Sequence, residues 1–279
     1  MGEIKIKNDE CIKSPEDINW EYFWQEKLLA KRKEKKDWNK AAKSFSKSTK
    51  QNEYMENLLY KMKLSKKDSV LDLGCGSGSI TVPIAKKSSY ITAIDSSEKM
   101  LELLKEKCEK EEIANVDIIH GNLEEITVDD VGNHDIVLFS RSFNGIWSVK
   151  QTIANINEIA NKYVYITLFG PNSWKFQKEF YESIGREYPE FASYHYLINI
   201  LIEMEIYPNV ENLEIETNRS YDSLHDAMNN GKWNLNSLKD DEKLKLHSYL
   251  KEKLIYNKER KLENHNDKRE WILIWWKKA

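Results

Sequence analysis

Three glycines at alternate positions follow a short apolar segment and constrain this chain more than any other stretch. Residues 70–78 read Val-Leu-Asp-Leu-Gly-Cys-Gly-Ser-Gly, so Gly74, Gly76 and Gly78 form a turn directly after the segment. Glycine adopts left-handed backbone conformations easily and lets a ligand approach the bare backbone. Apolar residues resume after Ser79 at helical spacing. The stretch therefore predicts a buried strand, a tight turn and a helix whose first N–H groups face a ligand bound over the turn.

The spacing of the glycines and two acidic residues narrow the kind of ligand. A dinucleotide-binding turn has the pattern Gly-x-Gly-x-x-Gly, whose third glycine would be residue 79, where this chain has serine. Asp72 lies just before the first glycine, and its charge would repel a phosphate and favour a cationic ligand. Asp95 ends the next apolar segment, where a carboxylate can accept hydrogen bonds from two ribose hydroxyls. The pattern predicts an adenosine-like ligand that carries a positive group and no pyrophosphate, and it disfavours a nicotinamide-dependent oxidoreductase.

Apolar segments alternate with amphipathic ones along much of the chain. The predicted strands are residues 70–73, 90–95, 116–120, 135–139, 163–168, 210–217 and 269–276. Near-continuous apolar strands separated by helices indicate a parallel sheet that is covered on both faces, and right-handed crossovers then give a doubly wound, Rossmann-like α/β fold. We expect a helical cap over 1–53, a ligand-binding core over 54–170, and a region over 171–279. That last region should hold helices, a helical insertion at about 221–262 and the last two strands of the sheet.

Two motifs in tandem carry a family resemblance. The first is the glycine turn with Asp72, and the second is Ala-Ile-Asp-Ser-Ser at 93–97, followed by Met100-Leu101. Together they resemble the class I S-adenosylmethionine-dependent methyltransferases, over about residues 38–170 and again at the last strand. The resemblance implies a seven-stranded, mostly parallel sheet whose last strand is antiparallel. It also implies that S-adenosyl-L-methionine binds over the carboxyl ends of the first four strands and leaves as S-adenosyl-L-homocysteine.

The resemblance also assigns positions of this chain to the methyl donor. Asp72 and the three glycines would contact the methionine part and the sulfonium side, Asp95 would hold the ribose hydroxyls, and Ser96 and Met100 would lie beside the adenine. Asn122 stands where the family often has an acid that accepts the adenine amino group, and an amide oxygen can accept the same bond. The donor-binding residues implied in this way are Asp72, Gly74, Cys75, Gly76, Gly78, Asp95, Ser96, Met100, Asn122, Leu123 and Ser140.

Two residues are candidates for handling the acceptor. Arg141 directly follows a predicted buried strand, where its cation either binds a substrate carboxylate or phosphate or forms a structural ion pair. His195 lies between Tyr194 and Tyr196 and is either a general base or a member of an aromatic cluster. Methyl transfer from a sulfonium depends mainly on alignment and exclusion of water, so a base is needed only if the acceptor must lose a proton. The histidines show no metal-ligand spacing, and no metal is predicted.

Charge and motifs favour a small-molecule acceptor. The net charge of −3 gives no overall attraction to nucleic acid or membranes. Some nucleic-acid methyltransferases of the resembled class hold an exocyclic amine with a proline motif after the fourth strand, and others use a Pro-Cys pair as the nucleophile. This chain has neither motif. Between residues 27 and 50, ten positive and two negative side chains give a local charge of +8, which indicates either a solvated helix face or phosphate contact. An RNA or protein methyltransferase that uses this run, and a non-catalytic donor-binding protein, are the alternatives.

The cysteines and the apolar runs bear on where the protein works. Cys11, Cys75 and Cys108 lie far apart in the chain and form neither a metal-ligand pair nor a disulfide framework. No stretch approaches the ~18 apolar residues of a membrane-spanning helix. We therefore expect a cytoplasmic protein without a membrane partner.

Overall fold

The computed structural model of the protein describes residues 18–29, 37–40, 42, 53–189, 191–213, 215, 218–268 and 270–278. The elements before and around the glycine turn are α1 (Trp20–Leu29), α3 (Glu53–Lys61), β1 (Ser69–Leu73), α4 (Thr81–Ala85), β2 (Tyr90–Asp95), α5 (Glu98–Lys110), β3 (Val116–His120), α6 (Val128–Val131), β4 (His134–Phe139), α7 (Val149–Ile159) and β5 (Ala160–Phe169). They are followed by α8 (Lys175–Ser183), α9 (Tyr194–Glu203), β6 (Asn209–Leu213), β7 (Asn218–Tyr221), α10 (Leu224–Asn230), α11 (Asp240–Lys253), β8 (Ile255–Tyr256), β9 (Leu262–Lys268) and β10 (Trp271–Lys277).

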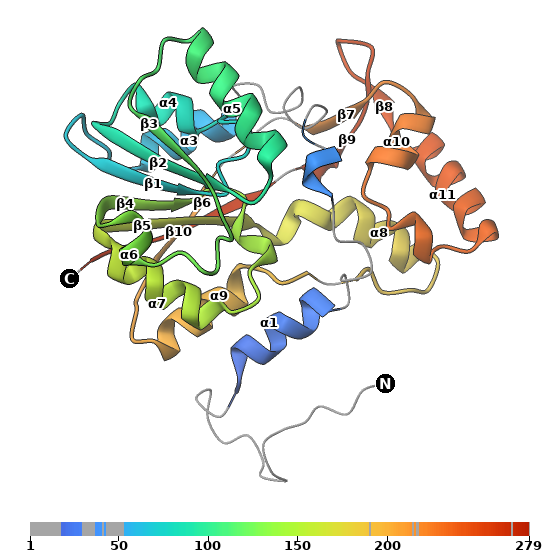
Figure 1. Cartoon of the computed structure of the whole chain (residues 1–279). Coiled ribbons are helices and arrows are strands. Elements are labelled where there is room, and N and C mark those ends of the chain that lie inside the picture. The colour runs from blue at the N-terminus through green and yellow to red at the C-terminus, as the bar shows by residue number, and fades with distance from the viewer. Residues whose placement is uncertain are drawn as a thin grey trace.

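A seven-stranded sheet forms the larger part of the molecule (Figure 1). Its strand order is β3-β2-β1-β4-β5-β10-β6, and β1 lies in the middle, parallel to β2 and β4. The last strand, β10, runs antiparallel to both β5 and β6. The predicted seven-stranded, mostly parallel sheet with an antiparallel last strand is therefore confirmed.

Helices cover both faces of this sheet, as the apolar strands predicted. On one face, α1, α7 and α9 pack against inward-pointing residues such as Leu73 and Phe139. On the other face, α3, α4 and α5 pack against residues such as Val70 and Leu138. Because successive side chains of a strand point to opposite faces, each of these buried strands supplies both layers. The helices thus hold β1 rigidly in the centre, with the glycine turn at its carboxyl end.

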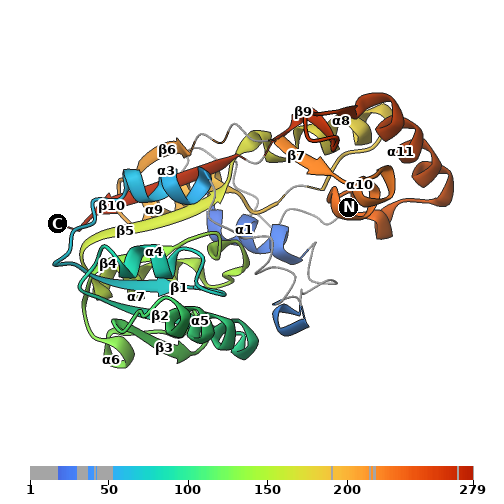
Figure 2. The same cartoon turned by 90° about the horizontal axis from the view of Figure 1, so that it is seen from above.

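A second lobe lies beside the sheet and is built around its own apolar cluster (Figure 2). It consists of α8, α10, α11 and a three-stranded sheet of order β7-β9-β8. Phe176 and Phe180 of α8 pack with Trp233 and Leu246 in its interior. The lobe thus contains the predicted helical insertion and, in addition, a small sheet that was not predicted.

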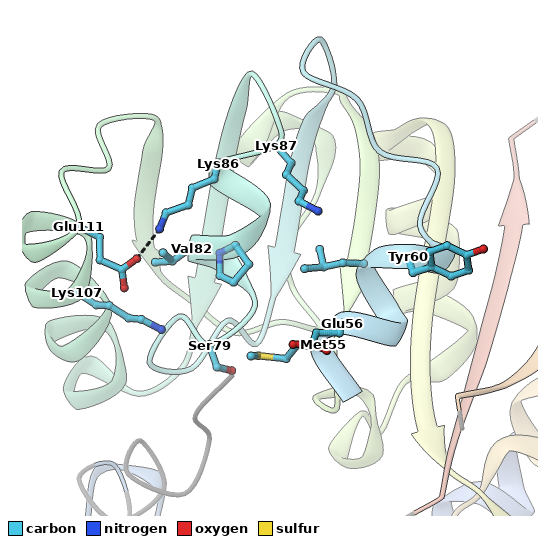
Figure 3. A pocket seen from close by; sticks show the side chains of 11 residues that line it. Met55, Glu56, Tyr60, Ser79, Val82, Lys86, Lys87, Lys107 and Glu111 are labelled. Atoms are coloured by element: carbon cyan, nitrogen blue, oxygen red, sulfur yellow. Dashed lines mark hydrogen bonds and ion pairs between the residues drawn. The ribbon is translucent and has the colours of Figure 1, made fainter. Parts of the chain in front are cut away.

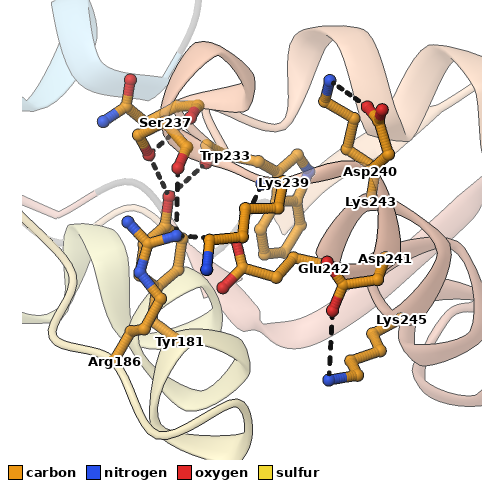
Figure 4. A network of polar contacts seen from close by, with 11 residues as sticks. Tyr181, Arg186, Trp233, Ser237, Lys239, Asp240, Asp241, Glu242, Lys243 and Lys245 are labelled. Atoms are coloured by element: carbon orange, nitrogen blue, oxygen red, sulfur yellow. Dashed lines mark hydrogen bonds and ion pairs between the residues drawn. The ribbon is translucent and has the colours of Figure 1, made fainter.

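Polar contacts reinforce the interior of the lobe (Figure 4). The guanidinium of Arg186 donates to Glu242 over 2.8 Å, and the Tyr181 hydroxyl donates to the Trp233 carbonyl over 2.8 Å. These bonds join α8 and the segment after it to the start of α11 and to the loop before α11. The lobe is therefore held together by both apolar packing and side-chain hydrogen bonds.

The chain leaves the seven-stranded sheet twice to build this lobe. The first excursion follows β5, and the second connects β6 to β10. At the joint, Trp271 pairs with Phe169 on one side and with Leu213 on the other. The side chain of Glu270 accepts from the Asn172 backbone N–H over 2.7 Å, and its carbonyl accepts from the Gly170 N–H over 2.9 Å. The entry and exit points of the lobe are thus bonded directly to each other.

Some expected segments differ in extent or fall outside the described residues. The strand expected at 210–217 is β6, which ends at Leu213. The helix expected to start near Ser79 begins at Thr81. Most of the basic run at 27–50 lies outside the described residues. In the described part of the chain, no helix has the length and apolar character needed to cross a membrane.

Candidate functional site

The glycine turn has the backbone geometry that its sequence predicts. Gly74, Gly76 and Gly78 have φ angles of +79°, +54° and +75°, which favour glycine over other residues. A Cβ atom on Gly74 would lie 2.2 Å from Cβ of Ser142, so the turn packs tightly against the loop after β4 there. A Cβ atom on Gly76 would meet no described atom within 4 Å. Gly76 is therefore the point at which a ligand can approach the backbone.

Asp95 lies directly beside this open position. Its Oδ2 atom accepts from the Gly76 N–H over 2.8 Å, and its Oδ1 atom accepts from the Ser97 N–H over 2.9 Å. Burial raises the pKa of Asp95, and the hydrogen bonds from Ser97 and Gly76 oppose that rise. The half-buried carboxylate thus ends β2 next to the turn. Each of its two oxygens has a further lone pair that can accept a hydrogen bond from a ligand.

Asp72 is placed differently from a residue that lies on the surface of the turn. It is fully buried, and its Oδ2 atom accepts from the Thr81 hydroxyl over 2.7 Å, while Oδ1 has no hydrogen-bond partner among the described residues. Burial raises the pKa of Asp72 to about 7. The Asp72 carboxyl group therefore lies inside the protein, behind the turn, rather than on the open face of the turn.

The remaining donor-binding candidates take several positions around the turn. Met100 is buried at the start of α5, where Ser97 caps the helix by accepting from the Met100 N–H. The Leu123 side chain lies 3.3 Å from the position of a Cβ atom on Gly74. Ser96 is exposed, and its carbonyl lies 3.1 Å from the ring of His120.

Asn122 and Cys75 have environments that limit what they can do. The Asn122 amide donates to Glu125 over 2.7 Å and its oxygen accepts from the Glu124 N–H over 3.3 Å, so the side chain shapes its own loop. The Cys75 side chain is buried, and burial raises the pKa of its thiol well above the ordinary range. A thiol of this kind is a poor nucleophile, since the thiolate is the reactive form.

A cluster of polar and aromatic residues flanks the turn on the side of β4 and β5. The Tyr54 hydroxyl lies 2.9 Å from Ser140 Oγ and 2.7 Å from Thr167 Oγ1, and the Arg141 N–H donates to the same Thr167 oxygen over 2.9 Å. The guanidinium carbon of Arg141 lies 4.4 Å from the ring centre of Tyr54 and 5.9 Å from that of Trp271. The predicted residues Ser140 and Arg141 thus share one small site with three residues that the sequence did not indicate.

His195 belongs to a separate part of the surface. It lies near the start of α9 and is exposed. Its Nδ1 atom lies 2.7 Å from Ser193 Oγ, and its ring lies 4.1 Å from that of Tyr196. The ring of His195 thus packs against Tyr196 at the start of α9.

Two described pieces of the N-terminal part of the chain contact the segments that follow β4 and β2. Trp24 of α1 is fully buried and donates from its indole to the Ile146 carbonyl over 2.7 Å. Farther along, Asn39 Oδ1 accepts from the Ser97 hydroxyl over 2.7 Å and from the Lys99 N–H over 3.3 Å. Asn39 therefore contacts the start of α5 and its capping residue Ser97, whose backbone N–H donates to Asp95.

An open groove of about 420 Å³ lies elsewhere, between α3, α4 and α5 (Figure 3). Its wall includes Ser79, Tyr60 and Lys107, and Lys86 there pairs with Glu111 over 2.8 Å. It lies on the helical layer of one face and includes none of the donor-binding candidates. We therefore place the candidate site at the turn, from the geometry of Asp95 and Gly76. Across the described residues, no group of three His, Cys, Asp or Glu side chains could hold a metal ion.

Sequence comparison finds several proteins that are similar to this chain. The chain is 29% identical over 266 residues to an uncharacterized protein of Haemophilus influenzae, covering 93% of this chain and 97% of that one. A protein of Methanocaldococcus jannaschii named "Probable cobalt-precorrin-6B C(15)-methyltransferase (decarboxylating)" is 36% identical over 102 residues, covering 37% of this chain and 50% of that one. The "23S rRNA (uracil(1939)-C(5))-methyltransferase RlmD" of Aliivibrio fischeri is 33% identical over 117 residues, covering 40% and 27%. The chain thus spans half or less of the two relatives that carry an activity in their names.

A solved structure shares the fold, and a family model matches the region around the glycine turn. The YcgJ protein of Bacillus subtilis shares the fold with a TM-score of 0.52 at 12% identity, over 81% of this chain and 98% of that one. Residues 70–162, from β1 into β5, match the family described as "Methyltransferase domain". This match contains the glycine turn and Asp95, so residues 70–162 form a methyltransferase domain. The seven-stranded sheet with its antiparallel last strand is the fold that the resemblance to class I S-adenosylmethionine-dependent methyltransferases implied.

Proposed function

We propose that this methyltransferase binds S-adenosyl-L-methionine over the glycine turn and transfers its methyl group to a small-molecule acceptor. The observation that carries the donor site is the Asp95 carboxylate, held 2.8 Å from the Gly76 N–H beside the open face of that glycine. A carboxylate at the end of β2 is suited to two ribose hydroxyls. The bare backbone at Gly76 accommodates the part of the donor that crosses the turn.

The charges beneath the turn suit a cationic donor. Asp72 is buried with one carboxylate oxygen lacking a hydrogen-bond partner, and burial raises its pKa to about 7. A positive group over the turn stabilises the ionised form of such a carboxyl group, because an opposite charge offsets part of the desolvation cost. Met100, Ser96, Leu123 and Asn122 then border the adenine side in this proposal.

The protein's role in the reaction is to hold two molecules in line. S-adenosyl-L-methionine supplies a methyl group that is already activated by its sulfonium. The chain's own residues orient the acceptor and exclude water, which can account for a large part of the rate of a displacement between two bound molecules. The cap residues Trp24 and Asn39 and the second lobe lie where they can cover the site. We assign residues 1–53 and 171–279 to the acceptor side and 54–170 to the donor side.

A small-molecule acceptor is favoured by the environment of the site. The loop after β4, residues 140–148, carries a single charged side chain, Arg141, which lies on aromatic rings. The name of the Methanocaldococcus jannaschii relative also denotes a small-molecule acceptor. An RNA acceptor remains the second candidate, because the Aliivibrio fischeri relative is named for rRNA and the run at 27–50 is basic. We place the reaction in the cytoplasm, from the unpaired cysteines.

Calorimetry with Asp95→Ala tests the donor site. We expect S-adenosyl-L-methionine and S-adenosyl-L-homocysteine to bind the wild-type protein, and NAD not to bind. Loss of Asp95 should weaken binding tenfold or more, since each hydrogen bond to a charged group contributes about 1.5–3 kcal/mol. Asp117→Ala, at an exposed acid of β3, is the matched control and should leave the affinity unchanged. Binding of NAD alone, or unchanged affinity in Asp95→Ala, would reject the assignment.

Transfer of a labelled methyl group separates the acceptor classes. The full chain is incubated with labelled donor and either a protein-free metabolite extract or total RNA. We expect label in the metabolite fraction. Label in RNA would favour the second candidate, and the absence of any S-adenosyl-L-homocysteine production would favour a donor-binding protein without transferase activity.

A further inference from the structure

The backbone of Arg141 has an unusual conformation that fixes the direction of its side chain. Arg141 has a φ angle of +62°, in the left-handed region that costs a residue other than glycine about 1–2 kcal/mol. The Thr167 hydroxyl holds it there by accepting from the Arg141 N–H over 2.9 Å. Residues in strained conformations that the surroundings enforce tend to occur at functional sites. The conformation therefore indicates that the position of this guanidinium matters for more than folding.

The Arg141 guanidinium stacks on two aromatic rings, and no carboxylate of the described residues pairs with it. Its carbon lies 4.4 Å from the ring centre of Tyr54 and 5.9 Å from that of Trp271, so the rings occupy the face of the cation. Stacking leaves the N–H groups at the edge of the guanidinium available for hydrogen bonds. Among the described residues, no carboxylate lies within the 4.0 Å of an ion pair with Arg141.

The two half-buried or buried arginines of the second lobe differ from Arg141 in this respect. Arg186 also lies over a tyrosine ring, at 5.5 Å from Tyr181, and pairs with Glu242 over 2.8 Å. Arg219 lies 5.1 Å from the ring of Trp174 and pairs with Asp267 over 3.2 Å. Both of these arginines thus have a carboxylate partner within the lobe, whereas no described carboxylate pairs with Arg141.

The residue after Arg141 contacts the start of the glycine turn. The next residue, Ser142, donates to the Leu73 carbonyl over 2.5 Å and contacts Gly74. The Arg141 backbone therefore lies one residue from a contact with the first glycine of the turn, on the side of β4. In the proposed function this is the side of the turn that the sulfonium end of the donor faces.

We propose that Arg141 is a specificity-determining residue that binds an oxyanion, a carboxylate or phosphate, of the methyl acceptor. This rests on the proposed function. The planar guanidinium can hold either group with two parallel hydrogen bonds. A bound oxyanion also separates two positive charges, the guanidinium and the sulfonium, which otherwise repel each other at short range. Binding of the acceptor oxyanion and of the cationic donor should therefore reinforce each other.

The methionine part of the donor carries a carboxylate too, so the experiment must distinguish the two sources. The probes are benzoate and inorganic phosphate, with benzamide as a neutral analogue of benzoate. Each is titrated into the S-adenosyl-L-methionine complex and the S-adenosyl-L-homocysteine complex of the wild-type protein, Arg141→Met and Arg141→Lys. Arg186→Met is the matched control, since it removes a stacked arginine from the second lobe.

The expected pattern assigns the oxyanion to the acceptor. At least one anionic probe should bind the wild-type complexes and benzamide should not, and binding should fall tenfold or more in Arg141→Met. Arg141→Lys, which keeps the charge but loses the planar fork, should bind with intermediate affinity. Probe binding should be tighter with S-adenosyl-L-methionine than with S-adenosyl-L-homocysteine, because only the former carries the sulfonium charge. Donor affinity should stay within about twofold in all variants.

Several results would overturn the proposal. If donor affinity falls tenfold or more in Arg141→Met, the arginine binds the donor's own carboxylate. If neither anion binds the wild-type complexes, or if both bind Arg141→Met equally well, Arg141 is not an oxyanion site. Failure of the wild-type protein to bind either donor form would instead reject the proposed function, so the two failures are distinguishable.

Discussion

Two regions of the molecule hold an arginine on aromatic rings, and they use it in opposite ways. In the second lobe, Arg219 and Asp267 have side chains 7% and 0% exposed and form an ion pair. The Tyr221 hydroxyl and the Gln177 amide also hydrogen-bond to Asp267. Arg141 lies just after the central strand β4 of the larger sheet. It is half-buried on Tyr54, and no described carboxylate pairs with it.

The contrast separates a charge that stabilises the fold from a charge that, in our proposal, binds a ligand. A buried charge without a partner is costly, so the lobe surrounds Arg219 and Asp267 with each other and with polar groups. Arg141 avoids most of that cost because it is only half-buried. A cation that the protein leaves exposed at one edge can exchange water for a ligand. The following predictions test this distinction.

The largest expected effect is on the paired arginine. Asp267→Asn leaves the Arg219 cation buried without its counter-charge, and removing one partner of a buried pair costs about 3–5 kcal/mol in the free energy of unfolding. Urea unfolding followed by circular dichroism measures the change. The control is Lys261→Ala, which breaks a pair with Asp222 on the surface and should cost no more than about 1 kcal/mol.

A double variant checks the physical reason. Arg219→Met with Asp267→Leu removes both charges and leaves no ion without a partner. Replacement of a buried pair by apolar residues is often neutral or stabilising. The double variant should therefore be more stable than Asp267→Asn, and an equal or greater loss would show that the charge itself is not what matters.

The second prediction concerns Asp72, a buried carboxyl group in the larger sheet, the region that also holds Arg141. Burial raises its pKa to about 7 from the 3.8 of an exposed aspartate. Between these pH values the folded protein holds a proton that the unfolded chain has lost, so stability should fall as the pH rises from about 4 to 7 and then level off. The loss is on the order of a few kcal/mol. The pKa of Asp95 is raised in the same direction by its burial and adds to the slope.

Urea unfolding of Asp72→Asn over this pH range provides the measurement. The amide keeps an oxygen that can accept from the Thr81 hydroxyl, but it does not titrate. The variant should therefore lose most of the decline that the wild-type protein shows between pH 4 and 7. An identical decline in both proteins would contradict the placement of the titrating group at Asp72.

A third prediction compares two glycines of the same turn. In Gly74→Ala the new Cβ would lie 2.2 Å from Ser142, whereas in Gly76→Ala it would meet no described atom within 4 Å. Both carry the strain of a positive φ, so Gly74→Ala should be less stable by the overpacking cost of about 1–3 kcal/mol. Gly76→Ala should retain more of its stability and still bind S-adenosyl-L-homocysteine weakly, because its methyl group occupies ligand space. Thermal unfolding and calorimetry measure both, and equal stability of the two variants would count against the packing at Gly74.

The smallest expected effect is on Arg141 itself. Arg141→Met removes a cation over the rings of Tyr54 and Trp271, and such contacts contribute about 0.5–1 kcal/mol when partly exposed. The free energy of unfolding should therefore change by about 1 kcal/mol or less, far less than in Asp267→Asn. A loss of the same size as in Asp267→Asn would mean that Arg141 is structural, and the contrast between the two regions would disappear.

Local patterns in the sequence were enough to predict the glycine turn and the strand that ends in Asp95. The apolar run before Gly74 and the acid at Asp95 lie next to each other in space because β1 and β2 are adjacent parallel strands. The neighbours of Arg141 could not be predicted in this way. Tyr54, Thr167 and Trp271 come from α3, β5 and β10, and their convergence depends on packing between distant segments rather than on spacing.

The small sheet of the second lobe was missed for a related reason. The strand β9 reads Leu-Glu-Asn-His-Asn-Asp-Lys and lacks the β-branched and aromatic residues that mark strands. Its buried positions hold Leu262, Asn264 and Asp267, so two of three inward side chains are polar. Asp267 is satisfied by Arg219 and Tyr221, which lie on the neighbouring strand β7. Such a strand can be recognised only once its partners are known.

The joint between the lobe and the sheet has a consequence for how this protein can change over evolution. Leu213 and Trp271 are paired neighbours, so the whole second excursion stands where a hairpin would need only a short turn. Its length and content can vary without shifting the strands that carry the glycine turn. If the lobe faces the acceptor as we propose, lineages could remodel it while they inherit the proposed donor site unchanged, and substrate choice and methyl-donor chemistry would then diverge at different rates within one chain.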